Sequence, residues 1–413
     1  MPILVDCPCG KKFRARDELS GKRVKCPACG QVLPVPSAKP APPTTPTGEI
    51  DMDALFRDLI QRDGSNLHVK AGRPAIFRIQ GVLQDQNMEP FDEEQVEGAC
   101  FGLMDQRQRE IFEHDGGTDL AHVVEHDGQE WRFRVNIFRQ MGKMALIAQT
   151  VPPTIPTFEQ LHLPGAMQRL CTFDQGMIVV AGMTGCGKTT TIASMLDWIN
   201  HNYEKHILTI EDPVEYVFHD DKCSVTQREI GTSVPSFEIA MKHAVREDPD
   251  VILVGEMRDM ESFLAAMHAA ETGHLVFGTI HSATAPSTIG RILDLFPQNM
   301  HSSLRSSLAF NMRAIIVQKL VPTVRDDPRV VPAVEIMLFN AMIKKLILED
   351  HDEKLVDAMA VARAEGMQQF NDSLYDFVER DYINHEAAFR SSPSAEQLKM
   401  LFKGISVKSG GIL

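Results

Sequence analysis

The feature that most constrains the fold of this chain is a glycine-rich stretch near the middle of the sequence. It reads Gly182, Met183, Thr184, Gly185, Cys186, Gly187, Lys188, Thr189 and Thr190. An apolar run at 177–181 precedes it, and an apolar pattern of helical spacing follows it to Ile199. This order predicts a strand, a phosphate-binding loop and a helix, because glycines let successive backbone N–H groups turn toward phosphate oxygens.

The individual residues of this loop have expected roles in binding ATP and Mg²⁺. Lys188 is expected to reach the β- and γ-phosphates, and Thr189 offers its hydroxyl to Mg²⁺. The start of the following helix adds roughly half a unit of positive charge beneath the anion. We interpret Cys186 as a small residue that fits the turn, with a reactive thiol as the alternative. A glycine-rich turn that ends in Lys-Thr by chance is disfavoured by the strand and helix patterns on either side.

Composition excludes several classes of protein. The chain has 413 residues, of which 43% are hydrophobic and 24% charged, which is ordinary for two or three globular domains. Its formal net charge of −14 argues against extensive nucleic-acid binding, which requires a basic face. The sequence shows no apolar run of the roughly 18 residues that a membrane span needs, and no signal peptide. We therefore expect a cytoplasmic protein that binds no nucleic acid and associates with membranes only through partners.

Residues 1–33 contain two short cysteine clusters that are typical of a zinc ribbon. Cys7 and Cys9 form a C-x-C turn, Cys26 and Cys29 form a C-x-x-C turn, and a glycine follows each turn. Four thiolates aimed at one point suit a structural Zn²⁺, and the polar stretch between the turns is expected to form a short hairpin. Metal binding would supply most of the folding free energy of so short a module. The first turn is one residue shorter than usual, so disulfides remain an alternative.

A proline-rich linker and a small α+β domain follow. Residues 34–49 contain six prolines and predict a semi-rigid tether. In residues 50–150, helical and strand patterns alternate, and they predict a domain of about a hundred residues. In the predicted strand at 131–138, Arg132 and Arg134 fall on one face. That face is either solvated or directed at a phosphate that a neighbouring subunit binds.

Residues 151–413 show the alternation of strands and helices that is typical of a doubly wound α/β domain. Two buried strands deliver carboxylates at their carboxyl ends, Glu211 and Glu256, and a third strand ends in His281. Ligands bind at this edge of open α/β sheets. Each residue could alternatively belong to an ordinary strand-ending turn, but their convergence beside a phosphate loop favours one site.

Four motifs in this order resemble one family, the secretion ATPases of type IV pili. They are the phosphate loop, an acidic box at 209–215, a second acidic motif at 246–259 and a histidine box at 272–281. The resemblance begins near residue 50, so the cysteine-rich region lies outside it. It implies a PAS-like N-terminal domain, a RecA-like P-loop ATPase domain with C-terminal helices, and a homohexameric ring that binds ATP between subunits.

The resemblance also implies roles for the predicted site residues. Glu256 orients or deprotonates the attacking water, Glu211 supports Mg²⁺ or that water, and His281 senses the γ-phosphate. Arginines of the N-terminal domain reach the nucleotide of the next subunit. Arg134 is favoured for this role because it precedes Val135 as the family's arginine does, although pairing within its own domain is the alternative. A second trans-acting arginine of the family is replaced here by Gln149.

The function that the resemblance implies is retraction of type IV pili in twitching motility. The expected partners are an inner-membrane platform protein and the pilus machinery, and the expected location is the cytoplasmic base of the pilus. In the stretch at 342–346, Lys344 replaces an arginine of the retraction branch. An accessory, assembly or secretion motor of the same family therefore stays open. A weakly hydrolysing, nucleotide-gated scaffold is disfavoured by Glu256, and a nucleic-acid-binding ATPase is disfavoured by the acidic charge balance.

Overall fold

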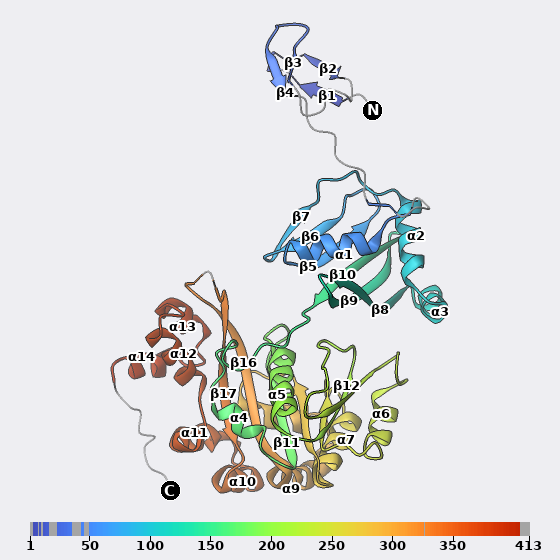
Figure 1. Cartoon of the computed structure of the whole chain (residues 1–413). Coiled ribbons are helices and arrows are strands. Elements are labelled where there is room, and N and C mark those ends of the chain that lie inside the picture. Colours follow the sequence, from blue (N-terminus) through green and yellow to red (C-terminus); the bar gives the residue numbers. More distant parts are fainter. Residues whose placement is uncertain are drawn as a thin grey trace. The chain divides into compact units, whose positions relative to one another are not determined.

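The computed structural model describes residues 3–6, 8–9, 11–15, 23–34, 43–44, 49–325 and 327–404 (Figure 1). The chain divides into two compact units, Met1–Pro153 and Thr154–Leu413. The boundary falls among three prolines, Pro152, Pro153 and Pro156. The finer division into segments 1–33, 34–49, 50–150 and 151–413 stays a prediction.

The cysteine-rich region forms two small hairpins. Strand β1 pairs antiparallel with β2, and β3 pairs antiparallel with β4. Their bounds are Ile3–Asp6, Lys12–Ala15, Arg23–Lys25 and Val32–Pro34. Each of these pairs spans its own cysteine turn, and the hairpin expected between the two clusters stays a prediction, because residues 16–22 lie outside the described residues. In the second turn, Gly30 has a φ of 75° and donates its N–H to the Cys26 carbonyl at 2.9 Å, which reverses the chain at once.

The rest of the first unit is an antiparallel sheet with helices packed on one face. The strand order is β7-β6-β5-β10-β9-β8. The strands are β5 (Gly64–Lys70), β6 (Ile76–Ile79), β7 (Val82–Asp85), β8 (Gly117–His126), β9 (Gln129–Gln140) and β10 (Lys143–Val151). The helices are α1 (Met52–Gln61), α2 (Glu93–Leu103) and α3 (Gln106–Asp115). Alternating strand residues such as Phe133 and Val135 share one core with all three helices.

The sheet of the second unit is mostly parallel and is buried on both faces. Its order is β13-β12-β14-β15-β11-β16-β17, in which β17 pairs antiparallel with β16. The strands are β11 (Gly176–Ala181), β12 (His206–Glu211), β13 (Ser224–Glu229), β14 (Val251–Val254), β15 (Leu275–Ile280), β16 (Met312–Pro322) and β17 (Val330–Leu338). This arrangement confirms the predicted α/β class, and it places the ends of β12, β14, β15 and β11 side by side.

Helices cover both faces of this sheet. Helices α4 (Ala166–Leu170) and α5 (Lys188–Asn202) pack into the core on one face. The core on the other face includes α6 (Phe237–Ala244), α7 (Met260–Glu271), α8 (Ala285–Leu293), α9 (His301–Asn311), α10 (Ala341–Leu348), α11 (Leu355–Val361), α12 (Phe370–Glu379), α13 (His385–Ser391) and α14 (Ala395–Phe402). Gly366, with a φ of 104°, ends a short 3-10 helix between α11 and α12. Within the described ranges, no helix has the length and apolar character needed to cross a membrane.

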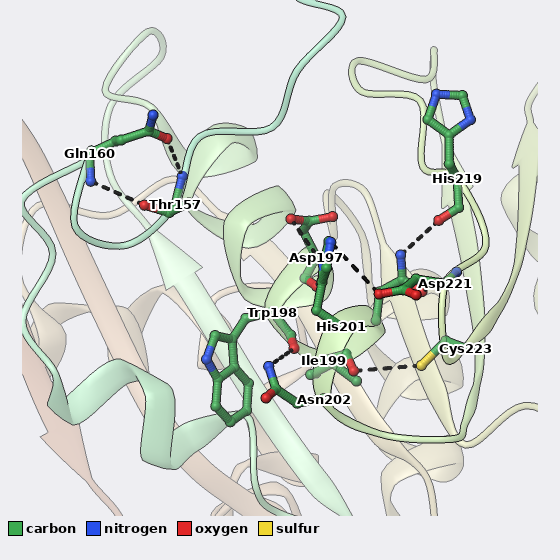
Figure 2. A network of polar contacts seen from close by, with 11 residues as sticks. Thr157, Gln160, Asp197, Trp198, Ile199, His201, Asn202, His219, Asp221 and Cys223 are labelled. Atoms are coloured by element: carbon green, nitrogen blue, oxygen red, sulfur yellow. Dashed lines mark hydrogen bonds and ion pairs between the residues drawn. The ribbon is translucent and has the colours of Figure 1, made fainter.

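A polar network anchors the far end of α5 (Figure 2). The buried amide of Asn200 donates to the His219 carbonyl at 2.7 Å and accepts the N–H of Asp221 at 3.2 Å. The Cys223 thiol donates to the Tyr203 carbonyl at 3.0 Å, and burial raises the pKa of this thiol. The helix that begins at the phosphate loop is therefore fixed at its far end as well.

A candidate nucleotide-binding site

The phosphate loop has the backbone geometry that its glycines predict. Gly182, Gly185 and Gly187 have φ values of 147°, 76° and 87°, which side chains rarely tolerate. A Cβ atom added to Gly182 would also meet the Cys186 sulfur and approach the Gln318 carbonyl oxygen to 2.6 Å. The loop therefore depends on glycine for both conformation and space, as a close cradle around an anion requires.

Gln318 supports the loop from the neighbouring strand β16. Its side-chain amide donates to the Cys186 carbonyl at 2.6 Å and accepts the Thr191 hydroxyl at 2.7 Å. The residue is buried, so these two bonds fix the loop against the first turn of α5. The sequence gives no signal for this role, because Gln318 lies far from the loop along the chain.

The side chains at the start of α5 are arranged as phosphate and metal binding requires. The Lys188 ammonium donates to the carbonyl oxygens of Gly182 and Met183 at 3.0 and 3.3 Å, so it already lies along the loop. The Thr190 hydroxyl contacts Tyr216 at 3.0 Å, whereas Thr189 is half-buried in the first turn. The loop residues thus fit a nucleotide phosphate group, and Thr189 fits the expected Mg²⁺ ligand.

The Cys186 thiol does not have the environment of a reactive cysteine. The residue is buried, and burial raises the pKa of its thiol although Lys188 acts in the opposite direction. A raised pKa leaves little nucleophilic thiolate at neutral pH. This favours the interpretation of Cys186 as a small residue that fits the turn.

Glu256 and His281 meet at the carboxyl edge of the sheet. Glu256 follows β14 and His281 follows β15, and the His281 Nε2 atom lies 2.9 Å from the Glu256 Oε1 atom. The other oxygen of Glu256 accepts a hydrogen bond from Arg258 at 2.6 Å. Burial would raise the pKa of Glu256, but Arg258 and His281 together outweigh burial and hold this pKa below its ordinary value. Glu256 is therefore an ionised carboxylate at neutral pH.

Glu211 is a second carboxyl group at the same edge, but it is deeply buried. It accepts hydrogen bonds from the Thr209 hydroxyl at 2.6 Å, from Gln227 at 3.3 Å and from the Glu215 N–H at 3.4 Å. Burial raises its pKa to about 7, although these bonds lower it. A carboxyl group balanced between its two protonation states at neutral pH responds strongly to a nearby cation.

A cleft lies against Glu256 and His281. Its volume is about 70 Å³. Its lining residues come from the ends of β14 and β15 and from α8 and the turn after it, and they are Glu256, Met257, Arg258, Ile280, His281, Arg291 and Leu295. Two arginines that the sequence did not single out therefore face the predicted catalytic carboxylate. Arg258 could have been suspected from its place within the acidic motif, whereas Arg291 carries no comparable signal.

The predicted arginines of the first unit lie on one face of its sheet. In β9, Phe133 and Val135 are buried, whereas Arg132 and Arg134 are half-buried on the opposite face. Arg134 is the direct cross-strand partner of Gln149. Its guanidinium makes no hydrogen bond or ion pair with any residue that the structure describes, whereas Arg132 has an interaction within the chain.

Cations gather on the same face of this sheet. His68 lies on β5, and its pKa is lowered by burial and then by the charges of Arg78 and Lys70. These residues and Arg134 share the sheet face that the helices leave uncovered. The face therefore carries basic side chains together with carboxyl groups such as Asp119, which lies opposite Asn136.

Three of the four predicted zinc ligands lie together. The sulfur atoms of Cys9, Cys26 and Cys29 all lie within 4.8 Å of one another, and those of Cys9 and Cys26 are 3.7 Å apart. Sulfurs bound to a tetrahedral Zn²⁺ at roughly 2.3 Å are separated by roughly 3.8 Å. The Ala28 N–H also points at the Cys26 sulfur at 3.4 Å. The fourth predicted ligand, Cys7, lies outside the described residues.

Comparison with known proteins gives consistent matches over the part of the chain that follows the cysteine-rich region. Residues 49–377 match the family model of type II/IV secretion system proteins. The type IV pilus retraction ATPase PilT of Pseudomonas aeruginosa is 38% identical over 339 residues, which span 82% of this chain and 97% of PilT. The ATPase PilU of the same organism is 33% identical over 354 residues, which span 86% of this chain and 92% of PilU.

A solved structure supports the same assignment. The crystal structure of the pilus retraction motor PilT with bound ADP matches with a TM-score of 0.77 and 38% identity, over 85% of this chain and 99% of that one. The predicted mixed α/β, RecA-like fold is thereby confirmed. On the strength of the family match and of both relatives, the chain belongs to the type II/IV secretion system protein family.

Proposed function

We propose that this chain is an ATP-hydrolysing motor that powers retraction of type IV pili. The observation that carries the proposal is the glycine-lined loop with Lys188, placed on the same sheet edge as the Glu256–His281 pair. The similarity to PilT, whose name describes pilus retraction, supports retraction rather than assembly as the task of the motor. A cytoplasmic position at the inner-membrane base of the pilus, in contact with a platform protein and the pilus machinery, belongs to this proposal.

Each residue of the site has its own role in phosphoryl transfer. The loop N–H groups and Lys188 hold the phosphates, and Thr189 would hold Mg²⁺, which would neutralise charge that develops during transfer. Glu256 is ionised, so it accepts a hydrogen bond or a proton from the attacking water. His281 contacts the same carboxylate and links it to the γ-phosphate position. Glu211 orders Mg²⁺ or that water from the neighbouring strand.

We propose that the site is completed by Arg134 of the next subunit in a homohexameric ring. The guanidinium of Arg134 has no hydrogen-bond or ion-pair partner among the described residues, and this supports the role. Because Gln149 lies directly opposite Arg134, the two positions present their side chains to the same neighbour. Arg134 can therefore supply the positive charge that a glutamine at position 149 lacks. Arg132, with an interaction of its own, contributes less.

We further propose that Cys7, Cys9, Cys26 and Cys29 bind a structural Zn²⁺. The sulfur separations and the N–H directed at Cys26 fit a thiolate cluster better than three unrelated cysteines. The zinc would fold the two hairpins into one module and would take no part in hydrolysis. Because the family match begins at residue 49, this module is an addition to the motor.

Deletion of the gene, followed by imaging of pili, tests the direction of work. Loss of a retraction motor leaves cells with excess pili that do not retract, whereas loss of an assembly motor leaves cells without pili. An accessory motor related to PilU is the second candidate, because Lys344 replaces an arginine on α10. Normal retraction without load but failure under load would favour that accessory role over the proposed one.

A further inference from the structure

Glu335 is a buried carboxyl group that the proposed mechanism does not use. It lies on β17 and is only 6% exposed. One of its oxygens accepts the backbone N–H of Ala285, the first residue of α8, at 2.5 Å. Burial of a carboxyl group costs free energy unless hydrogen bonds satisfy its oxygens. The presence of Glu335 at this position therefore calls for a structural or functional explanation.

A lysine on the neighbouring strand also acts on this carboxyl group. Lys319 lies on β16, and its ammonium is 4.3 Å from the ring of Phe370, the first residue of α12. Burial raises the pKa of Glu335, although the Ala285 N–H and the Lys319 charge lower it. The positive end of α8 thus has a buried acceptor in Glu335, which holds the start of this helix.

The helix that Glu335 holds leads directly to the catalytic carboxylate. His281 precedes Ala285 by four residues and contacts Glu256 at 2.9 Å. At the other end of α8, Arg291 lines the cleft beside Glu256. Thr284 caps the helix by accepting the Ser287 N–H at 3.2 Å, so the connection between His281 and α8 is short and stiff. A shift of the α8 N-terminus therefore moves both groups relative to Glu256.

We propose that Glu335 is a positioning residue for ATP hydrolysis. By holding the N-terminus of α8, it keeps His281 and Arg291 in fixed positions relative to Glu256. The inference deepens the proposed function and rests on it, because it takes Glu256 as the group that acts on water.

Two substitutions distinguish the contribution of Glu335 as a hydrogen-bond acceptor from the contributions of its charge and its volume. Glu335→Gln retains a carbonyl oxygen for the Ala285 N–H, so kcat should stay within about threefold. Glu335→Met fills the space without an acceptor, and kcat should fall by about 10²-fold while KM for ATP stays within threefold, because the phosphate loop is untouched. Met337→Ala, a buried residue on the same face of β17, controls for general loss of packing and should lower Tm but keep kcat.

Hydrogen exchange gives a readout that does not depend on turnover. In Glu335→Met, the amides at the start of α8 should exchange faster than in Met337→Ala, and in Glu335→Gln they should stay protected. If Glu335→Met does not fold, Glu335→Asp withdraws the acceptor by one methylene and should still lower kcat at constant KM. The proposal is overturned if Glu335→Met or Glu335→Asp keeps full kcat, or if Glu335→Gln loses as much activity as Glu335→Met. A fully active Glu256→Gln enzyme would instead overturn the proposed function itself.

Discussion

The two units of this chain place their candidate functional residues on sheets of opposite construction. In the second unit, the parallel strands are buried on both faces, and the candidate catalytic residues Glu211, Glu256 and His281 lie at the ends of these strands. In the first unit, the antiparallel sheet packs helices on one face and presents Arg134 on the other. The carboxyl edge of a parallel sheet brings side chains of one chain together. An uncovered sheet face presents its side chains to solvent or to a neighbouring molecule.

This difference suggests that the two units have different roles in the proposed motor. The second unit supplies the phosphate loop and its carboxylates, which suffice to bind a nucleotide and orient water. In the proposed mechanism, the first unit would supply charge to a neighbouring subunit, and it also carries the cysteine cluster. Substitutions in the second unit should therefore have the largest effects on turnover, and those in the first unit should depend on assembly.

The largest effect is expected from Glu256→Gln. The amide fills the same space but cannot accept a proton, so turnover should fall by about 10²–10⁴-fold while ATP binding and ring formation persist. Steady-state phosphate release, with nucleotide binding measured separately, checks this. Lys188→Ala is the matched variant, and it should weaken nucleotide binding itself. Unchanged phosphate release in Glu256→Gln would remove Glu256 from the mechanism.

The next largest effect is expected from Arg134→Ala. If Arg134 acts in trans, its loss should reduce turnover by about 10³-fold or more, as for arginine fingers in other nucleotide hydrolases. Mixing Arg134→Ala subunits with Glu256→Gln subunits should restore part of the activity, because some interfaces then contain both intact groups. Arg78→Ala is the control on the same face, since Arg78 donates to the Gly81 carbonyl of its own domain at 2.8 Å. Two variants that assemble together without any recovery would place Arg134 outside the neighbouring site.

The contrast between the units also explains what the sequence could predict. Long apolar runs that end in a polar residue mark parallel strands, so the phosphate loop, Glu256 and His281 could be placed from sequence, and the structure brings the last two into contact. Gln318 and Glu335 could not be placed, because they reach the loop and α8 across more than 40 residues of chain. Only tertiary packing creates such contacts.

Local signals were also missed in the first unit. Helix α3 was not predicted, because it contributes a single fully buried apolar residue, Phe112. Its capping box, formed by Asp105 and Gln108, was nevertheless visible in the sequence. The role of Arg134 cannot be read from alternation, since a solvated face and a subunit interface show the same pattern.

A smaller effect, on pH dependence, is expected from Arg258→Ala. Arg258 and His281 lower the pKa of Glu256, whereas burial raises it. Removal of Arg258 should therefore raise this pKa, so that Glu256 becomes protonated at a higher pH and the acid limb of the kcat profile moves upward. The wild-type enzyme should keep its activity to a lower pH than the variant does. Profiles with identical acid limbs would show that the Glu256–Arg258 contact does not control ionisation during turnover.

The smallest effect on turnover is expected from the cysteine cluster. Cys26→Ser should abolish binding of one Zn²⁺ per chain, measured by metal analysis, and leave phosphate release within about twofold of the wild-type rate. Cys100→Ser is the matched control, since Cys100 is a buried free cysteine outside the cluster and should leave the metal content unchanged. Removal of residues 1–48 should likewise spare hydrolysis. If the truncated ring hydrolyses ATP normally but fails to localise, the cluster organises a docking module. If turnover collapses, residues 1–48 are part of the motor, and the proposed division between the units is wrong.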